Sequence, residues 1–160
     1  MLGLSHCSTD PLGFDPGHFT ASVFLLSPDL QKVLLIHHAA FGLWIQPGGH
    51  LEPDDSSMLE AGLRELREEC SVVRSHEIAW IPMILDLDIH QVPPNDRKGH
   101  PAHLHFDVRF ARRAVDWDCS ATSEVRAAQW VSLAAVASID TDDSVRRALR
   151  RIAHHRQRAG

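Results

Sequence analysis

The sequence predicts a mixed α/β or α+β domain, and two kinds of pattern support this fold class. Several short stretches have the alternation or the β-branched and aromatic content of strands, whereas two longer stretches have the spacing of amphipathic helices. One helix is expected in the middle of the chain and the other at its end. With 160 residues the chain is most simply one domain, 1–160, in which 1–17 is an irregular lead-in with two prolines and three glycines.

Strands are expected in six places. An apolar, β-rich stretch at 18–26 is followed after a short turn by another at 32–37, and a short strand is expected at 41–46. Apolar and polar residues alternate over 85–90 and again over 104–110, and a further short strand is expected at 129–133. The segment 91–103 contains three prolines and a glycine and is expected to form a long loop of the kind that covers a site.

The first helix is expected at 58–70, with Ser56 or Ser57 as its N-cap. Its apolar stripe consists of Leu59, Leu63, Leu66 and Cys70. The second helix is expected at 144–155, with an inward face of Val145, Ala148, Leu149 and Ile152. Six arginines between 146 and 158 occupy its polar face and the tail that follows. A solvated face is the simplest interpretation, and contacts with phosphate or with a second copy in a homodimer are the alternatives.

Composition and charge exclude several classes of protein. The hydrophobic fraction of 44% and the charged fraction of 23% are ordinary for a globular domain, and a net charge of −5 argues against a nucleic-acid partner. The apolar runs have the length of strands and not of membrane spans, and the first residues lack the pattern of a secretory signal. The three cysteines are too far apart for a Cys-x-x-Cys site, so a cytoplasmic protein is the default expectation.

The stretch PGGHLEPDDSSMLEAGLRELREECSV, residues 47–72, concentrates seven carboxylates between Glu52 and Glu69. On the expected helix, Glu65, Glu68 and Glu69 stand at i, i+3 and i+4, which places them on one face. Like charges so close together destabilise a helix unless a cation lies over them. Mg²⁺ prefers oxygen ligands and commonly bridges carboxylates to phosphate oxygens, so the pattern favours a Mg²⁺ site.

A glycine pair precedes this acidic helix. Gly48 and Gly49 permit a tight backbone path in which a carbonyl points at a metal or a ligand, so loop and helix together form a plausible cradle for a metal-bound diphosphate. A solvated acidic face beside an ordinary turn is the simpler interpretation of either element alone. The combination at fixed spacing reverses that preference.

This segment resembles the Nudix box, G-x5-E-x7-R-E-U-x-E-E-x-G-U, in which U is a bulky aliphatic residue. Gly49 matches the opening glycine, residues 64–69 (RELREE) match R-E-U-x-E-E, and Val72 matches the last position. The resemblance implies the α/β/α sandwich of that family, with a mixed β-sheet, one catalytic helix after the Gly-rich loop and a C-terminal helix.

Three positions depart from the motif. Asp55 stands in place of the first glutamate, and eight residues instead of seven separate it from Arg64. The extra residue lies where loop becomes helix, so the spacing of the three glutamates is unchanged. Ser71 replaces the late glycine and indicates a slightly different helix exit, because glycine is the usual left-handed residue there. Either Asp55 or Glu52 replaces the missing glutamate, and both are candidate substrate contacts.

The resemblance implies hydrolysis of a nucleoside diphosphate linked to another group, with Mg²⁺ or Mn²⁺ as cofactor. Glu68, Glu69 and the carbonyl of Gly48 would be metal ligands. Glu65 would be a further ligand or the base that activates water, and Arg64 would orient Glu65 through a salt bridge. The implied catalytic residues are therefore Glu65, Arg64 and Glu68. A metal-bound water has a lowered pKa, and a neighbouring carboxylate can accept its proton.

Two further acidic residues, Glu124 and Glu52, are either metal contacts or ordinary surface or loop acids. By resemblance, Glu124, just before the strand expected at 129–133, is a candidate metal ligand, and a surface acid is the alternative. Glu52 either contacts a second metal or bonds to backbone amides of its own loop. Trp44, just before the glycine pair, is a candidate for stacking on a base, although a core aromatic is the simpler interpretation.

Four histidines gather around the expected loop: His90, His100, His103 and His105. A zinc site is one interpretation, because His-x-His places two imidazoles on one face of a strand. We prefer substrate contact by His103 and His105, or a polar solvent face, because the sequence shows no compact ligand set.

The sequence therefore predicts a Mg²⁺-dependent hydrolase of a small nucleotide or other diphosphate. One alternative is an isomerase on the same fold, which would need a catalytic cysteine, whereas Cys70 lies on the apolar stripe. The other is a regulatory module that binds diphosphate without hydrolysis. A degenerate box would be its sign, yet Arg64, Glu65, Glu68 and Glu69 are all present.

Overall fold

The computed structural model describes residues 14–38, 42–96, 99–123 and 125–159. Its elements, in chain order, are β1 Gly17–Leu26, β2 Lys32–His37, β3 Trp44–Ile45, β4 Gly48–His50, α1 Met58–Cys70, β5 Ser75–His76, β6 Asp86–Val92, β7 His103–Ala114, β8 Ala128–Ser132, a 3-10 turn Val136–Ser138 and α2 Asp143–Ala159. The predicted class, a mixed α+β fold with one helix mid-chain and one at the end, is confirmed.

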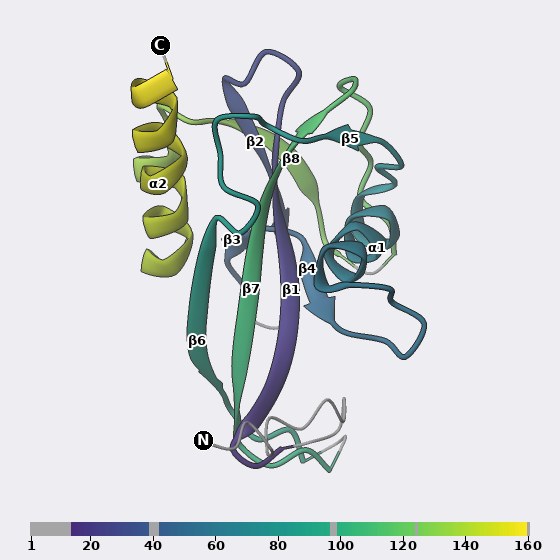
Figure 1. Ribbon diagram of the computed structural model, residues 1–160. Coiled ribbons are helices and arrows are strands. Elements are labelled where there is room, and N and C mark those ends of the chain that lie inside the picture. Colours follow the sequence, from purple (N-terminus) through teal and green to yellow (C-terminus); the bar gives the residue numbers. More distant parts are fainter. Residues whose placement is uncertain (1–13, 39–41, 97–98, 124, 160) are drawn as a thin grey trace, which may run out of the picture.

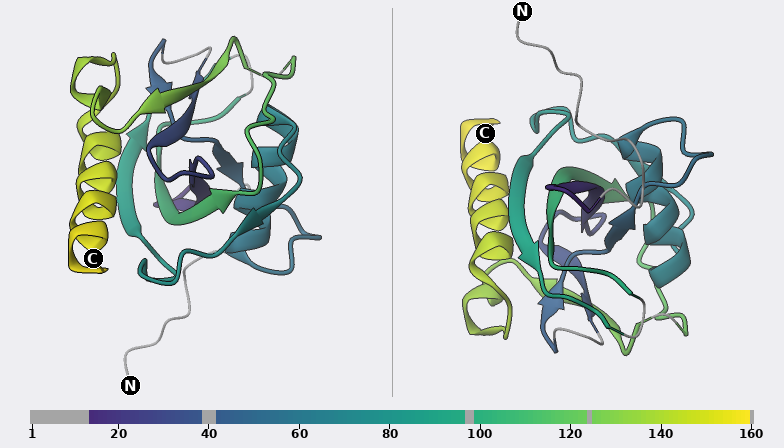
Figure 2. Two further views of the ribbon diagram at one scale, coloured as in Figure 1. Left: turned by 90° about the horizontal axis from the view of Figure 1, so that it is seen from above. Right: turned by 90° about the horizontal axis from the view of Figure 1, so that it is seen from below.

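The strands form one mixed sheet between the two helices. Figure 1 shows α1 beside one face of the sheet and α2 beside the other, and the views along the sheet in Figure 2 show the same three layers. The path of the sheet is β3-β2-β1-β7-β5, with β4 paired to β1, β6 to β7 and β8 to β2. The central pair, β1 with β7, is parallel over ten residue pairs, from Gly17↔Leu104 to Leu26↔Arg113.

Both faces of the central strands are buried, which produces two hydrophobic cores. Phe24 and Leu26 of β1 pack in the core under α2, whereas Val23 and Leu25 pack in the core under α1. Alternation along a strand sends successive side chains to opposite faces, so a strand covered on both faces is a continuous apolar run. On the α2 face the earlier positions of β1 are polar, and the sheet there is the floor of a cleft.

Helix α1 begins and ends where the sequence predicts. The hydroxyl of Ser57 accepts a hydrogen bond from the N–H of Glu60 at 3.2 Å, the expected N-cap. Its buried face differs from the predicted stripe: Leu66 and Cys70 are buried, but Leu59 and Leu63 are only partly so. The centre of the contact is instead Gly62, where an added Cβ would lie 3.0 Å from a methyl group of Val23. Small residues let the helix lie close to β1.

Several boundaries differ from the sequence prediction. Helix α2 extends to Ala159, beyond the predicted 144–155, and the strands β4 and β5 were not expected. The strand expected at 41–46 reduces to β3, and Phe41 lies outside the described residues. In the expected loop 91–103, β6 continues to Val92 and two backbone hydrogen bonds join Asn95 to His100. The loop is thus the tip of a hairpin between β6 and β7. Across the described residues, no helix has the length and apolar content needed to cross a membrane.

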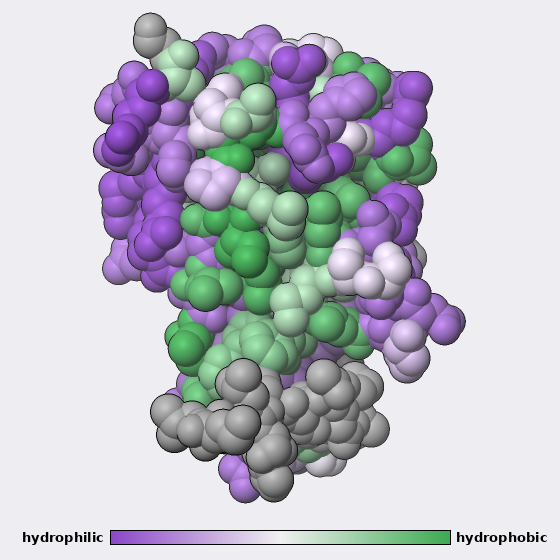
Figure 3. Space-filling model, viewed as in Figure 1, coloured by the Kyte–Doolittle hydropathy of each residue, from purple (hydrophilic) through white to green (hydrophobic). Residues whose placement is uncertain are grey.

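The first half of β6 buries its acidic side chains and exposes its apolar ones. Asp86 and Asp88 are 3% and 8% exposed, whereas Leu87 and Ile89 are each 65% exposed. The inversion is explained by two arginines that reach the buried acids: Arg109 lies 3.2 Å from Asp88, and Arg147 of α2 lies 2.8 Å from Asp86. Figure 3 shows apolar surface over this part of the sheet.

The end of α1 corrects one prediction. Ser71 adopts φ 58° and ψ 18°, the left-handed conformation that glycine usually takes, and its N–H donates to the carbonyl of Arg67 at 2.9 Å. The helix exit is therefore the one that the glycine of the motif would make, with serine bearing the steric cost of a Cβ in this conformation.

We expect Ser71→Gly to raise the free energy of unfolding by about 1 kcal/mol, because glycine adopts the left-handed conformation without that cost. Urea denaturation followed by circular dichroism measures the difference. Ser71→Ala is the matched control, since alanine keeps the Cβ and should bring no gain. A glycine variant no more stable than the alanine variant would contradict the explanation.

Candidate functional site

A cleft of about 540 Å³ opens over the polar half of the sheet. Its walls come from β1, from the segment around β4, from α1 and from the β6–β7 hairpin. Of the residues singled out in the sequence, the cleft brings together Gly48, Gly49, Glu65, His103 and His105. Segments far apart in the chain thus contribute to one space.

Arg64 is the centre of the charged groups at the edge of this cleft. Its Nη1 lies 3.1 Å from Glu65 Oε1 and 2.8 Å from Glu68 Oε2, so one guanidinium nitrogen donates to both carboxylates. Its Nε and Nη2 each lie 3.2 Å from the carboxylate of Asp55. Nη2 also donates to the backbone carbonyl of His50 at 2.7 Å. The guanidinium is therefore held on several sides, and the predicted salt bridge from Arg64 to Glu65 is present.

Asp55 and Glu52 contribute unequally. The side chain of Asp55 is 8% exposed and binds Arg64 through both oxygens, whereas that of Glu52 is 60% exposed and lies 3.8 Å from the guanidinium. Asp55 also accepts the N–H of Glu52 at 2.8 Å, which fixes the loop just before the extra residue. Burial acts to raise the pKa of the Asp55 carboxyl, but the hydrogen bonds from Arg64 and from the Glu52 N–H, together with the charges of Arg64 and Arg67, hold that pKa below its ordinary value.

The glycine pair lies directly against the carboxylates. The N–H of Gly48 donates to Glu69 Oε2 at 3.0 Å, and Glu69 is 8% exposed. A Cβ on Gly49 would lie 2.4 Å from Glu65 Oε1, so this glycine makes room for the carboxylate. A Cβ on Gly48 would instead lie 2.6 Å from the Cα of Ser22. The two glycines therefore have different roles, one toward the site and one toward the sheet.

These groups fit a hard divalent cation. The donors of Glu65, Glu68 and Glu69 are carboxylate oxygens, the ligands that Mg²⁺ prefers. Glu65 and Glu68 already face one cationic atom, the Nη1 of Arg64, so their oxygens converge without other help. Glu68 is the most accessible of the three, with 42% of its side chain exposed.

The remaining candidates lie in different places. Trp44 packs against the core under α2, and its ring meets that of His37 edge-on at 5.2 Å. It is not among the residues that line the cleft. Glu124 lies outside the described residues.

A buried ionic network forms the floor of the cleft. Asp107 accepts hydrogen bonds from Ser22 Oγ at 2.8 Å and from Arg109 Nε at 2.8 Å. Arg109 is 2% exposed and also reaches Asp88. Burial acts to raise the pKa of Asp88, but the bond from Arg147 and the charge of Arg109 bring it below its ordinary value. The network pairs the buried charges and connects α2 to the floor of the cleft.

Sequence reasoning missed three histidines at the site: His38 and His50, which line the cleft, and His18, which contacts His105. His18 of β1 is 3% exposed and is the register partner of His105 in β7. Its ring lies 4.8 Å, centre to centre, from that of His105. The signal available in the sequence was that the strand beginning near His18 starts with polar residues and continues with apolar ones. The parallel pairing of this strand with β7, which brings His18 to His105, could not be inferred from the sequence. The polar solvent face that the sequence offered as one interpretation is wrong for His103, which is 6% exposed.

Comparison with known proteins agrees with this geometry. The family model described as NUDIX domain matches residues 16–152. The chain is 38% identical over 91 residues to the m7GpppN-mRNA hydrolase NUDT17 of Bos taurus, an alignment that covers 53% of this chain and 29% of that protein. With the Xenopus laevis protein of the same name the identity is 41% over 81 residues, covering 48% and 26%. The match thus spans less than a third of the length of these relatives.

Solved structures share the fold at lower sequence identity. The MutT protein of Methanosarcina mazei Go1 superposes with a TM-score of 0.67 at 19% identity, over 88% of this chain and 96% of that chain. The NUDIX domain of Shewanella oneidensis NrtR, solved in complex with ADP ribose, has a TM-score of 0.58 at 24% identity and covers 94% of both chains.

The two glycines should respond differently to substitution by alanine. Gly48→Ala forces a Cβ against the backbone of β1 and should lower the free energy of unfolding by about 1–3 kcal/mol. Gly49→Ala meets only the end of the Glu65 side chain, which can turn away, so its loss should be below about 1 kcal/mol. Thermal and chemical denaturation measure both. Equal losses would show that the Glu65 side chain cannot move.

Asp55→Asn should destabilise the protein in a pH-dependent way. Because the folded pKa of Asp55 is depressed, its contribution is present above the unfolded pKa of about 4 and is lost as the pH falls through the folded pKa. We expect a loss of about 1–3 kcal/mol near neutral pH that shrinks in acid. Denaturation across a pH series tests this, with Asp54→Asn, an exposed neighbour, as control. A loss that did not change with pH would contradict the assignment.

Proposed function

Because the chain belongs to the Nudix family, we propose that it hydrolyses the diphosphate linkage of a nucleoside diphosphate joined to a further group. The observation that carries the proposal is the convergence of Glu65 and Glu68 on one nitrogen of Arg64 beside the cleft. This arrangement concentrates oxygen donors next to a space large enough for part of a nucleotide. The names of relatives, m7GpppN-mRNA hydrolase and a domain complexed with ADP ribose, support a nucleotide-type substrate.

We propose Mg²⁺ as the cofactor, with Mn²⁺ as the alternative. Glu65, Glu68, Glu69 and the carbonyl of Gly48 would hold it, and Glu124 is a further candidate ligand. When bound there, the ion would lower the pKa of a coordinated water and offset the charge of the diphosphate.

The protein's own groups position this chemistry. Glu65 lines the cleft against Gly49 and is placed to accept the proton of the attacking water. As the water oxygen bonds to phosphorus, the bond from phosphorus to the leaving phosphate oxygen breaks. Arg64 holds the carboxylates of Glu65 and Glu68 close together and orients them, because Asp55 and the His50 carbonyl keep the guanidinium in place.

The substrate's remaining part would lie along the wall formed by the β6–β7 hairpin. His103 and His105 face this space, together with the buried amide of Gln46. Groups that fix the orientation of a ligand in such a cleft select among substrates that share the same diphosphate.

An isomerase would need a reactive cysteine, and Cys70 is poorly suited to that role. It is buried in the core under α1, and burial raises the pKa of its thiol to about 12. A thiol that stays protonated near neutral pH is a weak nucleophile. The remaining alternative is a module that binds diphosphate without turnover.

The test is turnover by the purified chain with Mg²⁺ on nucleoside triphosphates, ADP-ribose, dinucleoside polyphosphates and capped dinucleotides. We expect Glu68→Gln to lower kcat/KM by about 100-fold or more on any active substrate, because it removes a metal ligand. Glu60→Gln is the matched control: Glu60 is exposed on the first turn of α1 and lies outside the cleft.

Each outcome has a distinct meaning. If the panel shows nucleotide binding by calorimetry but no cleavage products by chromatography, the non-hydrolytic alternative holds. Turnover that survives Glu68→Gln would instead overturn the assignment of the α1 carboxylates.

A further inference from the structure

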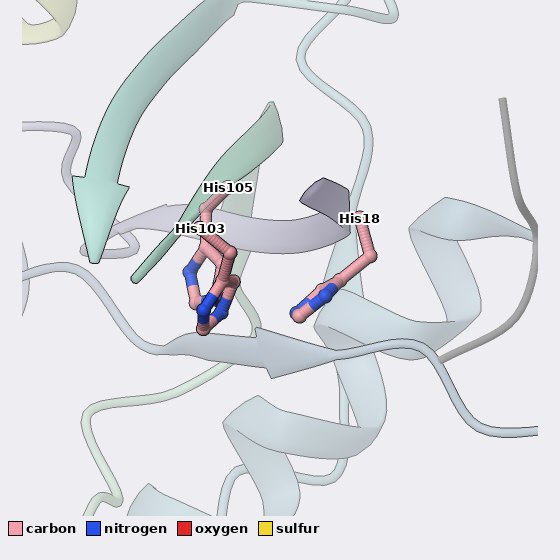
Figure 4. A group of neighbouring side chains, drawn as sticks. All are labelled: His18, His103 and His105. Carbon is pink, nitrogen blue, oxygen red and sulfur yellow. Dashed lines mark hydrogen bonds between the residues drawn. The ribbon is translucent and has the colours of Figure 1, made fainter. Parts of the chain in front are cut away.

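Three histidine rings meet beside the cleft, which His103 and His105 line. His18 comes from β1, and His103 and His105 come from β7, two residues apart on one face of the strand. Their ring centres are separated by 4.8 to 5.1 Å in all three pairings. One ligand nitrogen from each ring lies within 4.8 Å of the other two. Figure 4 shows the ring of His18 pointing from its strand toward the paired rings of His103 and His105.

The hydrogen bonds orient one of these rings for metal binding. His103 Nδ1 lies 2.8 Å from the carbonyl oxygen of Pro101. A carbonyl oxygen can only accept, so this nitrogen carries the proton, and the neutral ring has its lone pair on Nε2. That Nε2 lies 3.2 Å from Nε2 of His105. A bond from the far ring nitrogen to a backbone carbonyl is the usual support of a metal-binding histidine.

We propose that His18, His103 and His105 form a binding site for a borderline transition-metal ion of the Zn²⁺ class. Imidazole nitrogens suit Zn²⁺, Co²⁺ and Ni²⁺, whereas Mg²⁺ prefers oxygen. The site is therefore chemically distinct from the α1 carboxylates, and it does not depend on whether the chain hydrolyses diphosphates.

The separation between the Nε2 atoms of His103 and His105 matches tetrahedral coordination. With Zn–N bonds of about 2.0–2.1 Å, two tetrahedral ligands lie about 3.4 Å apart. The observed 3.2 Å between the Nε2 atoms of His103 and His105 is close to this separation. Since the ligand nitrogens all lie within 4.8 Å, the widest pair would need to close by no more than about 1.4 Å, within reach of small side-chain rotations.

The surroundings keep imidazole in its ligand form. Burial, reinforced by the neighbouring His50, His18, His90 and His103, lowers the pKa of His105 to about 3. Three protein ligands leave a fourth position, and His103 and His105 line the cleft, so a water or a substrate oxygen can complete the shell.

The experiment is a titration of chelator-treated, tag-free protein with Co²⁺ in excess Mg²⁺, which occupies oxygen sites. We expect one equivalent of Co²⁺ to give the visible absorption of four-coordinate cobalt, and Zn²⁺ to displace it. His18→Asn, His103→Asn and His105→Asn should each weaken binding by at least about 100-fold. The double variant His154→Asn/His155→Asn, which removes two imidazoles from α2 outside the cleft, should bind as the original protein does.

A second measurement uses the unaltered sequence, so that loss of folding in a variant cannot obscure the result. Nitrogen NMR of the imidazoles should show the signals of the three histidines shifting as one equivalent of Zn²⁺ is added. Absence of the four-coordinate cobalt spectrum, equal affinity in the cleft and α2 variants, or Zn²⁺ shifts confined to other histidines would each overturn the proposal.

Discussion

The parallel pairing of β1 with β7 places residues 87 positions apart in direct contact, as Thr20 and Asp107 show. The same register produces both hydrophobic cores, because the apolar half of each strand sends alternate side chains to opposite faces of the sheet. Toward the start of each strand one face turns polar, and there the register aligns His18 with His105 and Ser22 with Arg109. The cleft is therefore a consequence of strand pairing, and helix α1 and the hairpin add its walls.

Electrostatic balance is the second constraint on this structure. Arg64 neutralises Glu65, Glu68 and Asp55 at the edge of the cleft, while Arg109 and Arg147 neutralise three aspartates beneath it. Removing one partner of a buried ion pair leaves an uncompensated charge, so each arginine constrains several acids at once. The two sets differ in exposure: Arg109 and the three aspartates are buried, whereas Glu68 stays accessible.

One cleft thus contains two kinds of donor. At the α1 end, carboxylate oxygens lie beside Gly49, where an added Cβ would collide with Glu65. Along the β1–β7 wall the donors are imidazole nitrogens. Hard cations select the first and borderline cations the second. Because both open on the same space, a ligand with several oxygens can contact both sets, and the wall opposite the carboxylates becomes a place where substrates are distinguished.

The sequence by itself determined the fold class, the bounds of α1 and the one-face spacing of Glu65, Glu68 and Glu69, and it limited the N-cap to Ser56 or Ser57. These depend on local periodicity and capping, which lie within a few residues of one another. It mispredicted the exit at Ser71, where tertiary context imposes the left-handed conformation on a serine, and it left open the choice between Asp55 and Glu52. The tertiary structure decided that choice and buried the histidines, because strand partners and register bring together residues whose separation along the chain carries no local signal.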